Sequence, residues 1–398
     1  MTEATKSPVL DIVKVNSDHG HAQAYAELRE HGPVVRGEAF GGYWAVVSYD
    51  AIRRAANDVG NLCSGQGSTI PALGTAFRPI PVEVDPPDHR KYRQLLVPVL
   101  RPEKVAEWED LIRRETDIAI DRFIEAGSAD LMEIARYVPP AVIAFILGVS
   151  DEGPTMVKLT ADLNNAATAG DPEAKKAANM ALFQFVDQIV TDAEGTDRDD
   201  MLGMIANAQI DGAPIGHMKA VAMAVTVVIA GQETTVNGIS SALWLVAAHQ
   251  EVKQRLIENP ELIPNAVEES LRLETPVQMM GRTATTDIEL EGVRITEGER
   301  VGLAWGAANV DPAKFEDPEK FNIDRPNNPH VAFGHGIHRC AGEHLARAEM
   351  RIALEQVLAR MPDYRLAGEV ELGTSGAMNR GAHSVPVTFT PGARAYQN

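Results

Sequence analysis

The stretch FGHGIHRCAG, residues 333–342, decides the fold of this chain. It packs three glycines, two histidines and Cys340 into ten residues, and the segment behind it, EHLARAEMRIALEQVLARM (343–361), has the pattern of an amphipathic helix. Cys340 therefore lies at a predicted helix N-terminus, where unpaired N–H groups and the helix dipole stabilise a thiolate. The glycines remove side chains where a flat group could approach the backbone.

Three kinds of chemistry could use this cysteine. A zinc site could draw on His335, His338, Cys340 and His344, but structural zinc usually takes its ligands as pairs from two separate segments, and this spacing fits none of those patterns. A cysteine nucleophile would need a histidine base and a third orienting group that the sequence does not identify. The third possibility is a haem iron with an axial cysteinate.

The segment resembles the cysteine-loop signature of the cytochrome P450 family, F-G-x-G-x-H-x-C-x-G. Its fixed positions are occupied here by Phe333, Gly334, Gly336, His338, Cys340 and Gly342. The resemblance implies a mostly α fold with small β-sheets and haem b as the cofactor, with the Cys340 thiolate as its axial metal ligand. In that fold the haem lies between a long oxygen-activation helix and the helix that follows the cysteine loop.

A second motif, AGQETT (230–235), interrupts a helical pattern that runs from about residue 215 to 249. A glycine and two threonines are unfavourable in mid-helix, since threonine hydroxyls compete for backbone carbonyls and glycine costs about 1 kcal/mol. The motif is similar to the oxygen-activation motif of P450 proteins. That resemblance implies that Glu233 and Thr234 are catalytic and deliver protons, and that Ala230 leaves room for a diatomic ligand.

The pair Glu269 and Arg272 in EESLR has i, i+3 spacing, which places both side chains on one helix face. Such a pair is ordinarily an exposed ion pair of little energetic value. In P450-like proteins it instead anchors an irregular coil through a further arginine, which Arg325 in FNIDRP matches. The resemblance gives these three residues a structural role.

Haem carries two propionates, which require cations or hydrogen-bond donors. His89 and Arg93 in DPPDHRKYRQLL are spaced i, i+4 and project from one side of a predicted helix. The P450 resemblance implies that this pair contacts one propionate, and that Arg282 and His338 contact the other.

Bulk properties narrow the class of protein. The 398 residues are 44% hydrophobic and 23% charged, and they contain no repeat or long linker, so we expect one domain over 1–398 with a short tail at about 1–15. The net charge of −19 disfavours nucleic acid as a partner. Two cysteines and the absence of a signal-like N-terminus predict a cytoplasmic protein. The longest apolar run, 220–231, falls short of the ~20 residues that span a bilayer, so no membrane anchor is expected.

The resemblance implies a monooxygenase that inserts one oxygen atom of O2 into a small-to-medium apolar organic substrate, by hydroxylation or O-dealkylation. The chain has no G-x-G-x-x-G motif after a strand, so we expect electrons from a separate ferredoxin and an NAD(P)H-dependent ferredoxin reductase, and a monomeric enzyme. The predicted docking face is basic and comprises Arg90, Lys91, Arg101, Lys104, Arg339, Arg347 and Arg351. The alternatives are a peroxide-driven peroxygenase and a haem-thiolate protein that binds ligands or senses gas without oxidation. An intact Glu233–Thr234 pair argues against a sensor.

Family analogy also predicts walls for a substrate pocket. They lie in the loop 65–81, beside Ala230 and Thr234 on the long helix, in PVQMM (276–280) and near the C-terminus. The candidate lining residues are Ile229, Val277, Gln278, Met280 and Met378. They are mainly aliphatic or sulfur-bearing, which predicts a compact apolar ligand, with Gln278 as its polar anchor.

Overall fold

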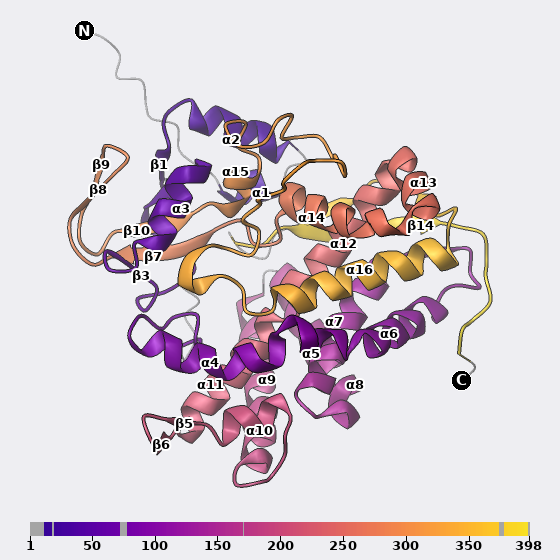
Figure 1. Cartoon of the computed structure of the whole chain (residues 1–398), viewed down its shortest axis with the longest axis horizontal. Helices are drawn as coiled ribbons and strands as arrows, with labels where there is room; N and C mark the ends of the chain where they lie inside the picture. The colour runs from indigo at the N-terminus through magenta and orange to yellow at the C-terminus, as the bar shows by residue number, and fades with distance from the viewer. Residues whose placement is uncertain (1–11, 18–19, 72–77, 170, 374–377, 397–398) are drawn as a thin grey trace.

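The computed structural model describes residues 12–17, 20–71, 78–169, 171–373 and 378–396. Most of the predicted tail and the middle of the predicted 65–81 pocket loop lie outside these ranges. Figure 1 shows a helical body beside a smaller part that is rich in strands, with α16 crossing the middle of the view. The expected architecture, mostly α with small sheets, is confirmed.

The described residues form the following α-helices: α1 Ile12–Ser17, α2 His21–Arg29, α3 Tyr49–Asn57, α4 Asp88–Leu100, α5 Pro102–Ala106, α6 Glu109–Asp121, α7 Met132–Ile146, α8 Gly153–Ala169, α9 Pro172–Ala193, α10 Met201–Ala206, α11 His217–Ala230, α12 Glu233–Ala248, α13 Gln250–Glu258, α14 Ile263–Glu274, α15 Trp305–Asn309 and α16 Glu343–Arg360. α7 is helical despite Pro139 and Pro140, because its apolar residues are almost all buried in the core. Packing therefore outweighs the unfavourable proline chemistry there.

The main sheet has the strand order β1-β2-β10-β7-β3. Its strands are β1 Val34–Gly37, β2 Tyr43–Val46, β10 Arg300–Leu303, β7 Met280–Ala284 and β3 Leu62–Cys63. β10 runs parallel to β2, whereas the other neighbours are antiparallel. The smaller sheets are β11 Arg365–Leu366 with β14 Pro386–Thr388 and β4 Ser128–Asp130, β12 Glu371–Gly373 with β13 Gly381–Ser384, β5 Gln209–Ile210 with β6 Ala213–Pro214, and β8 Ile288–Leu290 with β9 Val293–Ile295.

The helix expected over 215–249 is divided into α11 and α12. Gln232 departs from helical geometry, with φ −103° and ψ −77°, and Gly231 lies directly before it. A side chain at Gly231 would come within 2.6 Å of the tip of Ile143 in α7 and 3.1 Å of the Val227 carbonyl, so the backbone is closely packed here. The break falls inside the AGQETT motif.

The two-part helix lies in the core. It is long and apolar enough to cross a membrane by length and composition, but 61% of its most apolar window is buried inside the protein. α12 packs against α7, α14 and α16, which is the environment of a core helix. Its hydrophobicity is therefore explained by tertiary packing.

The chain between α15 and the cysteine loop forms a long coil, residues 310–335, without regular helix or strand. Glu269 and Arg272 of α14 are almost fully buried beneath it and joined by two 2.8 Å bonds. Arg325 from the coil donates to both oxygens of Glu269 at 3.2 Å. The three residues expected to act together are thus brought together at one buried point.

Candidate functional site

The cysteine loop is closed by its own backbone. The N–H of Cys340 donates to the carbonyl of Phe333 at 2.8 Å, so the loop folds back before α16 begins. Gly334 and Gly336 adopt φ values of +74° and +75°, which favour glycine. A side chain at Gly336 would also meet the carbonyl of Ala56, 2.8 Å away in α3.

The backbone gives two of the glycines a reason of their own. Positive φ values favour glycine at Gly334 and Gly336, and Gly336 also packs against α3. Gly342 has no such backbone reason for glycine. Its φ is ordinary, and the nearest atom that a side chain would meet is Cys340 Sγ at 4.0 Å.

The Cys340 thiol is exposed to open space, yet the surrounding protein still desolvates it. Burial raises the pKa of the thiol, a hydrogen bond from the Gly342 N–H opposes that rise, Glu343 adds to it, and the charges of Arg93 and Arg347 lower it. The net result for the protein alone is a raised pKa of the Cys340 thiol, with the Gly342 N–H favouring the thiolate. A coordinated metal ion deprotonates its thiol ligand outright.

The break between α11 and α12 carries the second motif. Thr234 donates its hydroxyl to the carbonyl of Ala230 at 2.9 Å, while the Gln232 N–H reaches Ile229 only at 3.4 Å. Ala230 is exposed although the preceding turns of α11 are buried, so the chain opens onto a space here. Glu233 begins α12 and is half-buried.

Four basic side chains gather near the cysteine. The rings of His89 and His338 are 4.4 Å apart, and His338 Nε2 lies 3.2 Å from the hydroxyl of Ser64. Arg282 is 3% exposed, and burial lowers its pKa to about 10. Burial and the charges of Arg282, His89 and Arg93 lower the pKa of His338 to about 3, so this ring is neutral at pH 7.

These four residues lack negative partners of their own. Within the described ranges, none of His89, Arg93, Arg282 and His338 forms an ion pair, and the buried Nε2 of His89 has no hydrogen-bond partner. The nearby Asp85 accepts from the backbone N–H groups of Ser64 and Gly65. The charge of Asp85 also favours the protonated forms of Arg282 and His89. A concentration of donors and positive charge that exceeds this one carboxylate suits a cofactor that brings two anionic groups. The residues present therefore fit haem.

The rival zinc site is not assembled. Among the described residues, no group of three or more His, Cys, Asp or Glu side chains could hold a metal ion. His338, one of the four candidate zinc ligands, instead forms a hydrogen bond with Ser64 and a ring contact with His89.

The predicted pocket residues separate into two groups. Ile229, Val277, Met280 and Met378 are half-buried, and an isolated bridge between Val277 and Asn379 places the two segments side by side. Gln278, in contrast, is fully buried. Its oxygen accepts from Tyr25 at 3.1 Å and its NH2 group donates to Thr275 at 2.7 Å, so the expectation that it anchors a ligand is corrected.

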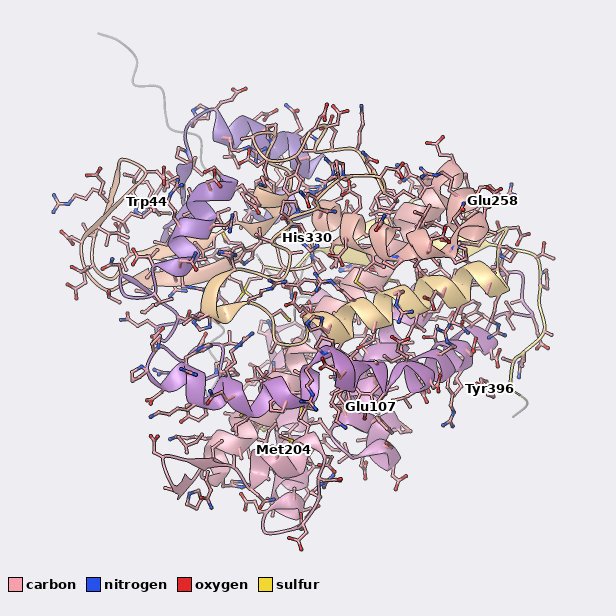
Figure 2. All side chains as sticks on the ribbon, in the orientation of Figure 1. Trp44, Glu107, Met204, Glu258, His330 and Tyr396 are labelled. Atoms are coloured by element: carbon pink, nitrogen blue, oxygen red, sulfur yellow. The ribbon has the colours of Figure 1, made fainter. Side chains whose placement is uncertain are left out.

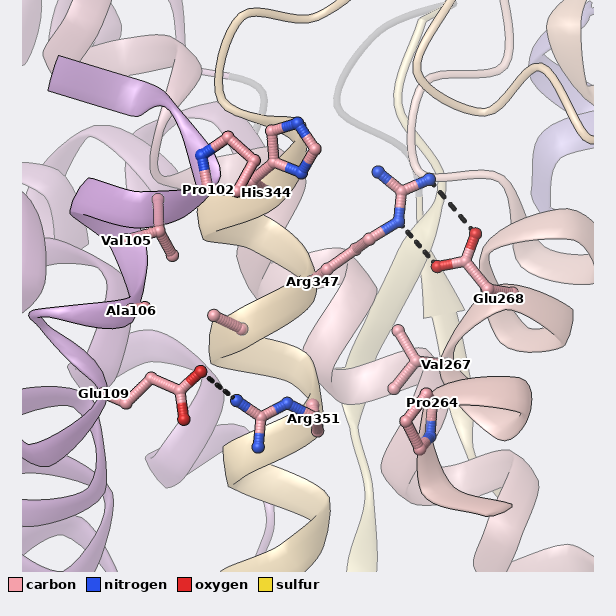
Figure 3. Close-up of a pocket in the computed structure, with 11 residues that line it drawn as sticks. Pro102, Val105, Ala106, Glu109, Pro264, Val267, Glu268, His344, Arg347 and Arg351 are labelled. Atoms are coloured by element: carbon pink, nitrogen blue, oxygen red, sulfur yellow. Dashed lines mark hydrogen bonds and ion pairs between the residues drawn. The ribbon is translucent and has the colours of Figure 1, made fainter. Parts of the chain in front are cut away.

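The predicted basic face is largely neutralised by local carboxylates. Arg347 pairs with Glu268 at 2.6 Å and with Glu343 at 2.8 Å, and Arg351 pairs with Glu109 at 2.6 Å. Figure 3 shows the Arg347–Glu268 and Arg351–Glu109 pairs lining a groove between α5, α16 and α14. The other pairs on this face include Arg351–Glu355, Arg339–Glu343, Lys104–Glu107, Lys91–Asp88, Lys91–Asp211 and Arg101–Glu103. Arg90 is exposed and has no ion pair among the described residues.

Several supporting residues carried no recognisable signal in the sequence. Ser64, which directly follows β3, contacts His338. Asn309 donates its side-chain NH2 to the Thr275 hydroxyl and accepts from the Val331 N–H. His330, labelled in Figure 2, lies 2.9 Å from Glu268. Each lies far along the chain from its partner, so only the folded structure reveals it.

Comparison with known proteins settles the family. A cytochrome P450 family model matches residues 171–361. A steroid C26-monooxygenase from Mycolicibacterium smegmatis is 33% identical over 402 residues, which cover 99% of both chains. This chain belongs to the cytochrome P450 family.

Two other P450 proteins match this chain over most of their length. Cytochrome P450-terp from a Pseudomonas species is 32% identical, with 77% of this chain and 75% of that protein covered. The crystal structure of CYP108D1 from Novosphingobium aromaticivorans superposes with a TM-score of 0.85 at 29% identity, covering 97% of this chain and 100% of the other. The protein is a cytochrome P450 monooxygenase, and its cofactor is haem b with Cys340 as axial thiolate.

Proposed function

We propose that this P450 hydroxylates or O-dealkylates a small-to-medium apolar organic molecule, with electrons supplied by a separate ferredoxin and its NAD(P)H-dependent reductase. The observation that carries the proposal is the opened helix at residues 230–234, because it places the half-buried Thr234 and Glu233 beside the exposed Ala230 at the end of the apolar helix α11. The names of three relatives, a steroid C26-monooxygenase, P450-terp and a mycinamicin IV hydroxylase/epoxidase, support an apolar organic substrate. A cytoplasmic location and a monomeric state stay predictions.

When bound, haem supplies the activation of O2, and the protein holds it and controls protons around it. Cys340 would ligate the iron, while His89, Arg93, Arg282 and His338 would receive the two propionates. Phe333 and Gly342 would support the thiolate side, and Ala230 would leave room on the opposite side. Ile229, Val277, Met280 and Met378 would line the substrate pocket.

Glu233 and Thr234 serve as the proton-delivering pair in this proposal. The Thr234 hydroxyl donates to the carbonyl of Ala230 across residues 231 and 232, so it lies at the break. Adjacent helical positions point about 100° apart, which lets the threonine face the open space while the acid lies in the wall. The acid can then resupply the hydroxyl through water.

The substrate class is tested by screening the purified holoprotein against steroids, terpenes, fatty acids and aromatic ethers. We expect an apolar compound to shift the iron from low to high spin in the absorption spectrum and then to yield a mono-oxygenated product with ferredoxin, reductase and NAD(P)H. Turnover that proceeds with hydrogen peroxide alone and not with the redox proteins would contradict the proposal.

Replacing Thr234 by alanine tests the proton-delivery pair. The variant should keep its substrate-induced spin shift, but it should divert most of the NAD(P)H it consumes to hydrogen peroxide, because general acid–base groups contribute roughly 10²–10⁴-fold to proton transfer. Product and peroxide are measured per NAD(P)H consumed.

A matched control is Thr116→Ala in α6. Thr116 makes the same bond to the carbonyl four residues earlier, 2.7 Å to Ile112, but it belongs to another helix. Coupling should be unchanged in this control. Equal coupling in Thr234→Ala and the parent enzyme would exclude Thr234 from the role.

A further inference from the structure

Glu268 of α14 binds two side chains with one carboxylate. Its Oε1 accepts from Nε of Arg347 at 2.6 Å, and its Oε2 accepts from Nη2 of the same guanidinium at 3.1 Å. Oε2 also lies 2.9 Å from Nε2 of His330. Glu268 therefore joins three parts of the chain, which are α14, the end of the long coil 310–335 and α16.

The hydrogen bonds of His330 fix the direction of its imidazole. Its Nδ1 lies 3.2 Å from the N–H of Ala332, which can only donate, so Nδ1 is the acceptor nitrogen. Nε2 then carries the hydrogen and donates to Glu268. The side chain of His330 is only 2% exposed, so this arrangement is shielded from solvent.

The ring of Phe333 lies against both of these side chains. The guanidinium carbon of Arg347 is 4.4 Å from the ring centroid, well within the roughly 6 Å of a cation–π contact. The ring centroid of His330 is 6.1 Å away, at an interplanar angle of 45°. An arginine that donates to one carboxylate through two nitrogens holds its guanidinium plane in one orientation. The carboxylate of Glu268 thereby decides how both groups meet the ring.

Phe333 is also a fixed point of the cysteine loop. Its carbonyl accepts from the N–H of Cys340 at 2.8 Å, and the next residue, Gly334, donates its N–H to Val331 at 2.9 Å. A displacement of Phe333 would therefore be carried to the residue that ligates the iron. Groups behind a metal ligand set its orientation and its strength as a donor.

The acid that does this precedes Glu269, which anchors the long coil. Neighbouring positions in a helix point about 100° apart, so two adjacent acids can bind different partners. Glu269 is 1% exposed and binds Arg272 and Arg325 beneath the coil. Glu268 instead lies in the wall of the groove that Figure 3 shows. α14 therefore contacts the coil with one acid and the support of the cysteine loop with the other.

We propose that Glu268 is a positioning residue for the axial thiolate. It holds Arg347 and His330 against Phe333, and Phe333 in turn fixes the cysteine loop. Each step from Glu268 to Arg347, to Phe333 and to the N–H of Cys340 is a direct contact. The role concerns the cofactor and does not depend on the substrate or the redox partner proposed above, so its failure would leave that proposal standing.

Glu268→Gln tests the role in the holoprotein. The amide has the size of the carboxylate, but its NH2 group would face a donor of Arg347 or His330, so one of them should leave Phe333. We expect the reduced carbonyl complex to lose its red-shifted thiolate absorption several-fold faster than in the parent protein. The reduction potential of the iron should rise, because a less firmly held thiolate donates less electron density. Absorption spectra over time and spectroelectrochemistry measure the two effects.

Glu109→Gln is the matched control. Glu109 pairs with Arg351 at 2.6 Å across the same groove, and Arg351 lies one helical turn beyond Arg347 on the side away from the cysteine loop. This variant removes the same unit of negative charge. Its potential should rise less than that of Glu268→Gln, and its thiolate absorption should decay at the parent rate. Equal changes in the two variants would reveal an effect of charge alone and would overturn the proposal.

A double-mutant cycle with Phe333→Leu tests the path. Leucine keeps an apolar side chain but offers no aromatic ring to Arg347 and His330. If Glu268 acts through Phe333, adding Glu268→Gln to Phe333→Leu should change the decay rate and the potential much less than the same substitution does in the parent protein. Effects that add in full would contradict the path.

Arg347→Lys takes the place of Glu268→Gln if that variant fails to fold with haem. Lysine keeps the positive charge and can still pair with Glu268, but its ammonium lacks the planar guanidinium that lies over Phe333. The thiolate absorption should again be lost several-fold faster than in the parent. Parent-like decay and potential in Arg347→Lys would overturn the proposal.

Discussion

At the scale of single residues, Glu349 of α16 is a buried acid that the proposed chemistry does not use. It is 0% exposed, and neither carboxylate oxygen has a hydrogen-bond partner in the described part of the chain. Burial raises the pKa of Glu349 well above its usual value. The side chain is therefore a neutral carboxylic acid in the native protein at mildly acidic pH.

This raised pKa makes stability depend on pH in a defined direction. The native state binds its proton more tightly than the unfolded state, so the free energy of unfolding falls as pH rises above the unfolded pKa of about 4.3. Glu349→Met should raise the free energy of unfolding at pH 7 by about 1–3 kcal/mol, since it removes an unpaired polar group at similar volume. Urea denaturation of the holoprotein from pH 5 to 8 measures both effects.

Glu349→Gln separates charge from polarity in this experiment. The amide cannot titrate, so the slope of stability with pH should flatten as it does in the methionine variant. The amide remains an unpaired polar group, so most of the stabilisation at pH 5 should be absent. An unchanged slope in both variants would show that Glu349 keeps a normal pKa.

At the scale of elements, α14 holds the long coil 310–335 in place. Arg272 is 0% exposed and donates to the carbonyls of Asn309, Pro318 and Lys320, as well as to Glu269. Glu269 in turn accepts from Arg325, the Asn322 N–H and the Asn328 amide. An irregular segment thereby obtains the backbone partners that it cannot provide for itself.

Arg272→Lys should cost roughly 3–5 kcal/mol of stability, because one ammonium cannot replace the forked guanidinium and Glu269 stays buried. The coil should also become the first site of cleavage in limited proteolysis. Arg255→Ala is the control, since Arg255 also links a helix to the coil through Asp324, but both side chains are exposed. It should cost less than about 1 kcal/mol. Equal costs for the two variants would exclude the anchoring role.

At the scale of the whole molecule, the net charge of −19 is distributed so that carboxylates also cover the face around the cysteine loop. Burial would raise the pKa of Glu268, but hydrogen bonds from His330 and Arg347 outweigh it and lower the pKa to about 2. Glu268 is thus ionised and cancels charge that the predicted docking face would need. Arg90, which is exposed and forms no ion pair among the described residues, is the better candidate for contact with the proposed ferredoxin.

Arg90→Glu should slow reduction by the ferredoxin at low ionic strength by about tenfold and weaken the salt dependence of the rate, because electrostatic steering is lost. Stopped-flow absorbance of the reduced carbonyl complex measures the rate. Arg294→Glu, on the exposed β8–β9 hairpin, is the control and should have little effect. The same rate loss in both variants would point to net charge and would exclude a docking face at Arg90.

The sequence by itself determined the family-level features. The pattern around Cys340, the AGQETT motif and the Glu269–Arg272 spacing are local, so their residue types identified the cysteine loop, the interrupted helix and the coil anchor. The AGQETT motif, whose glycine and threonines are unfavourable in mid-helix, lies where the long helix breaks. Local signals suffice when a residue's environment is set by its near neighbours in the chain.

Only the tertiary structure decided which side chains are buried and which charges are paired. Gln278 faces the core and Arg347 is paired with Glu268, and neither follows from spacing. Each depends on a partner far away in sequence, Tyr25 for Gln278 and Glu268 for Arg347. Desolvation and pairing are set by all the atoms around a group, and the chain order does not record which atoms those are.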